Sequence, residues 1–420
     1  WVQNRRDMGG VIFLDVKDRE GVAQVVCNMQ HLPPEDFHHA ETLHMQSVIQ
    51  VEGEIRHRDE ETYNPRLATG EVELLAKRLV VLSEAQPLPY SMDEDAKVRE
   101  ELRLKYRYLD LRRPQLQKAL RFRHQVQMAA EKYLNGDGFT CIETPMLCKS
   151  TPEGARDYLV PSRVHPGKFY ALPQSPQIFK QMLMVGGMDK YYQVARCFRD
   201  EDLRADRQPE FTQIDLEMSF VDVDDILECL EGFVKHLYKT VLNVDIPTPL
   251  PRLTYDEAMT RYGSDKPDTR FGMEITDISD IVKDCGFSVF KDAVANGGSV
   301  RGIVAKGAAA KLTRKEIDKQ TEFVRGIGAK GLAYVRWVDD APNCSFAKFM
   351  GEGELEAILK ALGCEKGDVA LIVADKDKVT LPVLGALRLK IAKQLDIIPE
   401  GWNFLWIVEF PFFEYDEESG

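Results

Sequence analysis

The sequence predicts an α+β protein of several domains, and three observations lead to this class. At 420 residues the chain exceeds the roughly 100–200 residues of a single domain. The region up to about residue 82 consists almost entirely of strand patterns separated by turns, whereas the region from about 251 to 400 alternates short strands and helices. Between them, residues 191–220 form two strand patterns around a charged loop. We therefore expect a β-barrel, a sheet-based middle domain and an inserted α+β domain.

Composition excludes several classes of protein. Hydrophobic residues make up 44% of the chain and charged residues 29%, which argues against wholesale disorder. No apolar run approaches the ~20 residues that span a bilayer, and we find no signal or transit peptide. Eight cysteines without a CxxC pair favour reduced thiols in the cytoplasm. Because the net charge is −13, any RNA binding must depend on local basic surface.

Residues 1–83 carry the pattern of an OB-fold barrel. Five strand-like segments are separated by turns such as DMGG and REG, and a helix-like stretch near Glu35–Met45 falls between the third and fourth segments. Such barrels bind single-stranded nucleic acid by stacking bases on aromatic rings and contacting phosphates through Arg and Lys. The alternative is that Phe13 is a core residue and the arginines are solvated. The candidate nucleic-acid residues are Arg6, Phe13, Gln24, Arg56, Arg58 and Glu73.

A linker and a basic stretch follow the barrel. The segment EAQPLPYSMDED (84–95) is acidic and contains proline, and ten Lys and Arg residues against three acidic ones fall between Lys97 and Arg123. A run of charge is usually a solvated face. Here it either lies along an RNA backbone or pairs with acidic residues, and the sequence leaves both open. The expected boundaries are 1–83 for the barrel, 84–114 for the linker, 115–250 for the middle domain, 251–400 for the insertion and 401–420 for the return to the middle domain.

The middle domain is expected to begin with a helix near Gln115–Asn135, which ends at the glycines of GDGF. The next segment, FTCIETPML (139–147), is predicted to be a strand interrupted by Pro145. Because proline cannot donate a ladder hydrogen bond, this strand suits a sheet edge or an interface.

Polar and apolar residues alternate along FTQIDLEMSF (211–220). Gln213, Asp215, Glu217 and Ser219 share one face, and Ile214, Leu216, Met218 and Phe220 share the other. The polar face is either the floor of a ligand site or merely a solvated sheet surface. The preceding loop favours a site, because it places both signs of charge close together and Arg suits bidentate phosphate contact. The charged and amide residues of that loop include Arg199, Asp200, Glu201, Arg204, Asp206, Arg207 and Gln208.

Three of these segments resemble the class II aminoacyl-tRNA synthetases. FRDEDLRADRQPEFTQID (198–215) resembles motif 2 of the class, specifically that of bacterial-type aspartyl enzymes. FTCIETPML resembles motif 1, with Pro145 at the place of the motif's proline near the dimer interface. KYRYLDLRRP (105–114) resembles a signature that the aspartyl, asparaginyl and lysyl enzymes share.

Further segments extend the resemblance over essentially the whole chain. TPEGARDYLVPSR (151–163) and LPQSPQIFKQ (172–181) are similar to amino-acid-site segments of the aspartyl branch. YGSDKPD (262–268) and GAKGLAYVRW (328–337) are similar to the domain inserted between motifs 2 and 3 of bacterial aspartyl enzymes. The resemblance thus implies an antiparallel class II sheet with a bacterial-type insertion.

The resemblance implies a homodimeric enzyme that joins L-aspartate to tRNA(Asp) with ATP and Mg²⁺, with tRNA(Asn) open as a second acceptor. Such catalysis needs positioning and charge neutralisation more than proton transfer. By the family's roles, Arg199 holds the α-phosphate and the substrate carboxylate, Phe211 stacks on adenine, and Lys180 pairs with the aspartate side chain. The matching positions for aspartate are Glu153, Ser175, Gln177, Lys180, Arg199 and Asp215, and those for ATP are Arg199, Asp200, Glu201, Gln208, Phe211 and Gln213.

The resemblance also makes the barrel an anticodon-binding domain, in which Phe13 stacks on a loop base and Gln24 and Glu73 read base edges. In the family, motif 3, a His-His-Pro segment, an acidic Mg²⁺ pair and a further substrate Arg follow the position of Gly420. We therefore expect a chain truncated before motif 3, and no residue is assigned to the metal. The strand pattern already under way at Trp1 leads us to expect a trimmed N-terminus as well.

Three other functions compete with this one. An asparaginyl or lysyl enzyme is disfavoured by the QSPQIFK segment and the insertion. A catalytically inactive RNA-binding paralogue would not need the particular set of Lys180, Arg199, Glu201, Phe211 and Asp215. A single-strand binding protein built on the barrel alone leaves residues 140–420 without a role.

Overall fold

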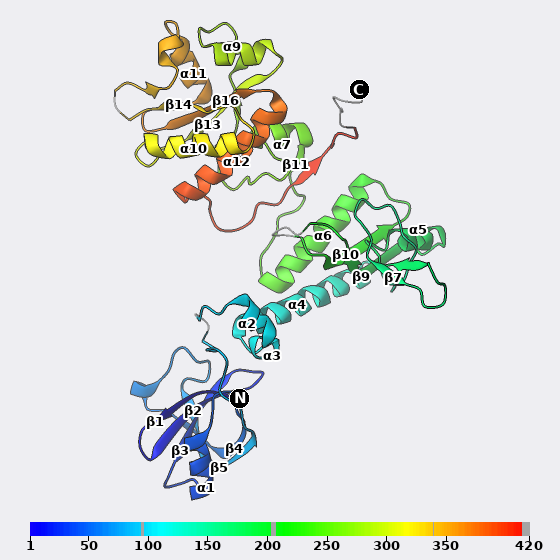
Figure 1. Ribbon diagram of the computed structural model, residues 1–420, viewed down its shortest axis with the longest axis vertical. Helices are drawn as coiled ribbons and strands as arrows, with labels where there is room; N and C mark the ends of the chain where they lie inside the picture. Colours follow the sequence, from blue (N-terminus) through cyan, green and yellow to red (C-terminus); the bar gives the residue numbers. More distant parts are fainter. Residues whose placement is uncertain (94–95, 203–206, 339, 414–420) are drawn as a thin grey trace. The chain divides into compact units, whose positions relative to one another are not determined.

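The computed structural model describes residues 1–93, 96–202, 207–338 and 340–413. The chain divides into two units, Trp1–Gln125 and Val126–Gly420 (Figure 1). In the described residues, no helix combines the length and the apolar character needed to cross a membrane.

The first unit begins with a five-stranded barrel. Its strands follow the order β1-β2-β3-β5-β4, with antiparallel neighbours except for the parallel pair β3 and β5. Hydrogen bonds from Val2 N–H to Ser47 O (2.9 Å) and from Gln46 N–H to Val2 O (2.7 Å) connect β1 to the start of β4. This topology confirms the OB-fold prediction. The elements are β1 (Val2–Asp7), β2 (Val11–Lys17), β3 (Val22–Asn28), α1 (Pro34–Thr42), β4 (Val48–His57), η1 (Glu60–Thr62) and β5 (Val72–Ser83).

The barrel core follows the strand alternation. Ile12 and Leu14 on β2 are fully buried, and Phe37 and Ala40 of α1 pack into the same cluster. Phe13, between the two buried residues, therefore faces outward and is half-buried. The alternative that placed Phe13 in the core is wrong.

The basic stretch forms three helices, and several of its charges pair within the first unit. Asp110 is completely buried and accepts hydrogen bonds from Arg103 Nε (2.9 Å) and Nη2 (3.2 Å) and from Arg107 Nη1 (2.6 Å). Arg112 donates to Gln46 Oε1 at 3.2 Å. At least these arginines serve the packing of the unit. The helices are α2 (Glu100–Lys105), α3 (Arg107–Asp110) and α4 (Pro114–Gly136), the last of which continues into the second unit.

Asp110→Asn is expected to lower the free energy of unfolding by about 2–3 kcal/mol, because it weakens hydrogen bonds between charged groups in a buried site. The hydrogen bond from Arg103 holds the pKa of the Asp110 carboxyl below its usual value. A lowered folded-state pKa stabilises the fold above the unfolded pKa, and this contribution is lost as pH falls below about 4. Denaturant unfolding at neutral pH and near pH 3 should show the difference between wild type and variant shrinking in acid. Asp59→Asn, at an exposed position of the same unit, is the control, and an equal difference at both pH values would contradict the prediction.

The second unit begins with a mixed sheet of order β10-β9-β6. β9 and β10 pair antiparallel from Glu210↔Phe198 to Met218↔Lys190, and β6 lies parallel to β9. One face of this sheet packs on α4 and α6 through Leu134, Tyr192 and Phe233. The elements are β6 (Thr140–Cys141), β7 (Leu159–Pro161), β8 (Phe169–Ala171), α5 (Gln177–Val185), β9 (Lys190–Phe198), β10 (Glu210–Met218), α6 (Val223–Leu242), β11 (Arg252–Thr254) and β17 (Trp406–Val408).

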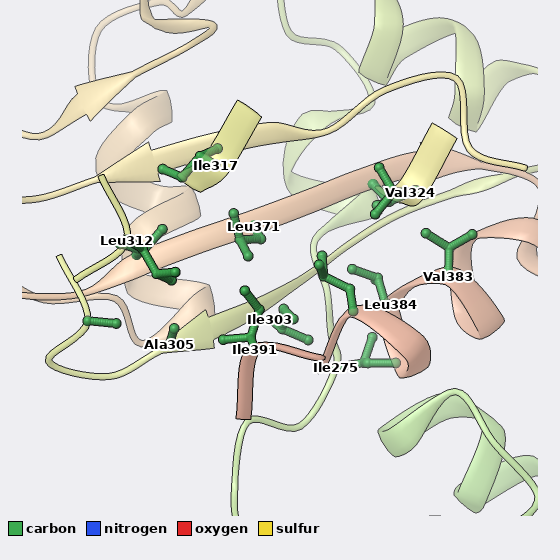
Figure 2. Packing of buried hydrophobic residues seen from close by; sticks show 14 of the residues in the cluster. Ile275, Ile303, Ala305, Leu312, Ile317, Val324, Leu371, Val383, Leu384 and Ile391 are labelled. Atoms are coloured by element: carbon green, nitrogen blue, oxygen red, sulfur yellow. The ribbon is translucent and has the colours of Figure 1, made fainter. Parts of the chain in front are cut away.

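The segment between β11 and β17 folds as an α+β layer structure. Its sheet has the order β12-β13-β16-β14-β15, with all neighbours antiparallel. Ile303 and Leu371 point to a core with α10 and α12 (Figure 2), whereas Val300 and Ile372 point to a second core with α8, α9 and α11. The elements are α7 (Tyr255–Tyr262), β12 (Thr276–Asp277), α8 (Ser279–Val282), α9 (Ser288–Ala295), β13 (Ser299–Ala305), α10 (Arg314–Gly326), β14 (Ala333–Arg336), β15 (Asn343–Cys344), η2 (Ala347–Phe349), α11 (Glu354–Leu362), β16 (Val369–Asp375) and α12 (Asp377–Leu395).

The two ends of this segment lie side by side. β11 and β17 pair in parallel from Arg252↔Trp406 to Thr254↔Val408. Arg270 donates to Pro399 O (3.3 Å) and Gly401 O (3.0 Å), which ties the incoming loop to the outgoing one. The predicted α+β multidomain class is confirmed, while the exact domain boundaries stay predictions.

Candidate active site

The free face of the β9–β10 sheet presents the predicted polar row. Gln213, Asp215 and Glu217 lie opposite Ala195, Gln193 and Tyr191 on this face. Ile214, Leu216 and Met218 pack on the opposite, apolar face, as the alternation predicts. The last two positions of the pattern do not follow it, because β10 ends at Met218. Phe220 is 97% exposed with a positive φ of 59°, so its assignment to the apolar face is wrong.

Lys180 meets two carboxylates of this row. Its Nζ lies 3.0 Å from Asp215 Oδ1, 3.2 Å from Glu217 Oε2 and 3.4 Å from Leu216 O. The Lys180 and Asp215 side chains are 10% and 11% exposed. Burial raises the pKa of the Asp215 carboxyl, and the hydrogen bond from Lys180 opposes this shift. Asp215 Oδ2 is buried without a hydrogen-bond partner, which leaves one acceptor of the site available.

The loop 148–157 and the segment 171–179 line a cavity of about 300 Å³. Glu153 and Ser175 both line it, and Ser175 Oγ donates to Glu153 Oε2 at 2.7 Å. Gln177 is the first residue of α5, three positions before Lys180 on the same helix. The structure thus brings Glu153 and Ser175 together at one cavity and Lys180 and Asp215 together on the sheet.

The loop after β9 lines a second cavity, of about 310 Å³. The Arg199 guanidinium lies 5.2 Å from the centre of the Phe211 ring, within cation–π range, and its Nε is buried without a hydrogen-bond partner. Glu201 pairs with Arg207 at 3.3 Å. The cavity lining comprises Arg199, Glu201, Asp202, Arg207, Gln208, Pro209 and Phe211.

Two predicted ATP residues lie elsewhere. Asp200 does not line this cavity and instead forms a β-bridge with Arg156. Gln213 lies on the sheet face, where its Oε1 is 3.3 Å from Cys197 Sγ. Arg204 and Asp206 lie outside the described residues.

Cys197 lies on β9 directly opposite Phe211, and Asp215 lies on β10 opposite Gln193. Burial raises the pKa of the Cys197 thiol to about 11. The β9–β10 ladder therefore carries Phe211 of the predicted ATP residues and Asp215 of the predicted aspartate residues. We did not predict Gln174 and Gln193, which are buried here. Side chains alternate between the two faces of a strand, so the position of Gln193 on β9, opposite Asp215, could have identified it. Its Oε1 accepts hydrogen bonds from Thr144 Oγ1 and from Tyr191 OH, each at 2.9 Å.

The barrel gathers its predicted residues on one surface. Gln24 donates to Glu73 Oε2 at 2.7 Å and accepts from Arg6 Nη2 at 2.8 Å. Arg56 donates to Glu73 Oε1 at 2.8 Å. The Arg6 guanidinium lies 5.7 Å from the Phe13 ring centre.

Arg58 differs from the other members of this surface. Its side chain is 3% exposed, with Nε 3.8 Å from Glu73 Oε2 and 3.1 Å from Val72 O. The description of the arginines as solvated is therefore wrong for Arg58. The surface is a connected network centred on Glu73, with the Phe13 ring beside Arg6.

The remaining predicted position, Pro145, is exposed beyond the edge strand β6. Among the described residues, no group of three or more His, Cys, Asp or Glu side chains is arranged to hold a metal ion.

We compared the sequence and the structure of this chain with those of known proteins. Residues 99–419 match the model for class II tRNA synthetases (D, K and N), and residues 1–82 match the model for the OB-fold nucleic acid binding domain. In structure the chain is similar to an asparaginyl-tRNA synthetase from Pyrococcus horikoshii complexed with asparaginyl-adenylate, with a TM-score of 0.55, 92% of each chain covered and 19% identity. At that identity the likeness concerns the fold.

Sequence relatives are considerably more similar. The aspartate–tRNA(Asp/Asn) ligase of Caldanaerobacter subterraneus is 54% identical over 420 residues, which are 100% of this chain and 71% of the relative. The aspartate–tRNA ligase of Ruminiclostridium cellulolyticum is 55% identical over 421 residues, 100% of this chain and 70% of the relative. The chain therefore belongs to the class II tRNA synthetases of the D, K and N group and, within that group, to the aspartate–tRNA ligase family.

Proposed function

We propose that this protein activates L-aspartate with ATP and transfers the aspartyl group to tRNA(Asp). The observation that carries the proposal is the buried Lys180 ammonium, held by Asp215 and Glu217 at 3.0 and 3.2 Å. A buried cation suits an anionic side chain, because it attracts the charge of a carboxylate and gains no such attraction from a neutral amide. The same argument disfavours asparagine and lysine as substrates.

The proposed chemistry has two steps. An α-carboxylate oxygen of aspartate attacks the α-phosphorus of ATP, the bond to the β-phosphate oxygen breaks, and pyrophosphate leaves. A hydroxyl of the terminal tRNA adenosine then attacks the aspartyl carbonyl carbon, and AMP leaves. Arg199 would neutralise the charge at the α-phosphate and Phe211 would stack on adenine. Lys180, Glu153 and Ser175 would hold the amino acid, with Gln177 and Asp215 orienting Lys180.

ATP is expected to bring Mg²⁺ as its counter-ion. Since the described residues contain no acidic cluster suited to a metal, we derive no step through it. We also propose a homodimer, supported by Pro145 and the exposed Met146 and Leu147 beside edge strand β6. The eight free cysteines support a cytoplasmic location.

Pyrophosphate exchange in the protein as its gene encodes it tests the proposal. Exchange is expected with L-aspartate and not with L-asparagine or L-lysine. Exchange driven by asparagine would assign the asparaginyl function, and no exchange with any of the three would favour the inactive RNA-binding paralogue. Charging of tRNA(Asp) and tRNA(Asn) transcripts then tests the acceptor, because the names of the relatives differ on this point.

The anticodon role of the barrel has its own prediction. Phe13→Ala is expected to raise the KM for tRNA about 5- to 150-fold, because loss of a stacked base costs about 1–3 kcal/mol. Aspartate-dependent pyrophosphate exchange without tRNA should not change. Met29→Ala, at an exposed position of the same barrel, is the control. An unchanged KM for tRNA in Phe13→Ala would remove this ring from the RNA surface.

A further inference from the structure

Gln174 is an almost completely buried amide beside the proposed aspartate site. It is 1% exposed. Its Nε2 donates to Ala155 O at 2.9 Å and to Asp157 Oδ1 at 2.6 Å, and its Oε1 accepts from Ala155 N–H at 3.2 Å. One side chain therefore binds both the donor and the acceptor of a single peptide residue. This fixes the loop that carries Glu153 relative to the segment before α5.

These bonds join the two walls of the 300 Å³ cavity. The walls are also joined at Cys148 and Ala171, whose backbone groups exchange hydrogen bonds of 3.0 and 2.9 Å. Asp157 is further held by Ser150 Oγ. Gln174 directly precedes Ser175 in the chain and so holds the loop at the point where Ser175 meets Glu153.

We infer that Gln174 is a positioning residue for the amino-acid site. By holding Ala155 and Asp157 it sets the Glu153 carboxylate 2.7 Å from Ser175 Oγ, where both groups can bind the substrate ammonium. This inference rests on the proposed function, because it takes this cavity as the aspartate site. Both N–H groups of Gln174 are engaged with protein atoms, so its effect on the substrate passes through the loop.

Only an amide satisfies this position. Nε2 must donate twice and Oε1 must accept once, which neither a carboxylate nor an alkyl side chain can do. In Gln174→Glu, a carboxylate would lie against the Asp157 carboxylate in a buried site, where like charges repel strongly. In Gln174→Ala, Ala155 and Asp157 would lose their partner. Each variant frees the loop and displaces Glu153.

The experiment is aspartate-dependent pyrophosphate exchange in the protein as its gene encodes it. Both variants are expected to raise the KM for aspartate about 10- to 100-fold, the range expected for a lost buried hydrogen-bonded partner. The KM for ATP should stay within about threefold, since four of the proposed ATP residues, Arg199, Glu201, Gln208 and Phe211, line the other cavity. Gln181→Ala, an exposed glutamine on the same helix α5 as Lys180, is the matched control.

Measuring the aspartate KM at several pH values distinguishes a positioning role of Gln174 from a simple loss of folded protein. The added carboxyl of Gln174→Glu should have a raised pKa, so lowering the pH from about 8 to about 6 protonates it and restores one donor. The ratio of its aspartate KM to that of wild type should then fall, whereas for Gln174→Ala the ratio should stay constant. An unchanged aspartate KM in both variants, or equal increases in the KM values for aspartate and ATP, would overturn the inference. A wild type that does not respond to aspartate would overturn the proposed function instead.

Discussion

Lys180→Met is expected to raise the KM for aspartate at least about 30-fold while the KM for ATP stays nearly constant. Truncating one partner of a buried, hydrogen-bonded charge pair costs about 2–5 kcal/mol. Here the loss leaves Asp215 and Glu217, two carboxylates that were 3.0 and 3.2 Å from the ammonium, facing an anionic substrate. The preference for aspartate over asparagine should fall by a comparable factor, because the variant no longer offers a counter-ion. Pyrophosphate exchange with each amino acid measures both quantities.

Lys168→Met, at an exposed lysine in the β7–β8 turn of the same unit, controls for the loss of a positive charge outside the site. An unchanged aspartate KM in Lys180→Met, with an active wild type, would remove Lys180 from substrate binding. A simultaneous rise in the KM for ATP would show that the variant disturbs the sheet as a whole.

The second large effect is expected for Arg199→Lys, which should lower kcat for pyrophosphate exchange about 100- to 1,000-fold, as the loss of a transition-state donor does. The planar guanidinium lies against Phe211 at 5.2 Å and can bind two anionic groups at once, whereas an ammonium is a single point of charge. Arg199→Lys therefore keeps the positive charge but loses the planar group that can bind two anionic groups at once. Arg163→Lys, at an exposed position, is the control, and a kcat within about threefold of wild type would contradict the role.

The sequence predicted best those features that repeat along the chain. The alternation of β10 identified Asp215 and Glu217 as neighbours on one face, because a strand has a fixed period of two. The same reasoning failed at Phe220, since periodicity does not show where a strand ends. Hydrogen bonds between segments that are distant in the sequence were harder to predict. Gln174 lies in an irregular segment, and its partners lie 17 and 19 positions away, so no local pattern reveals it.

The roles of the arginines in the basic stretch (97–123) were also not predictable from the sequence alone. The net charge of this stretch left RNA contact and pairing with acidic residues equally open, and the structure shows that Asp110, one of only three acids in it, is completely buried and binds Arg103 and Arg107. A charge count weights all residues equally, whereas a buried carboxylate influences its neighbours far more than an exposed one. Burial is a property of the folded chain, so counting could not assign these arginines.

The parallel pairing of β11 and β17 has a consequence for chain entropy. The segment between these strands has hydrophobic cores of its own, and its two ends meet at adjacent hydrogen-bonded strands. The entropy of closing a long connection grows only slowly with its length. The length of this segment can therefore change at little entropic cost to the strands that carry it.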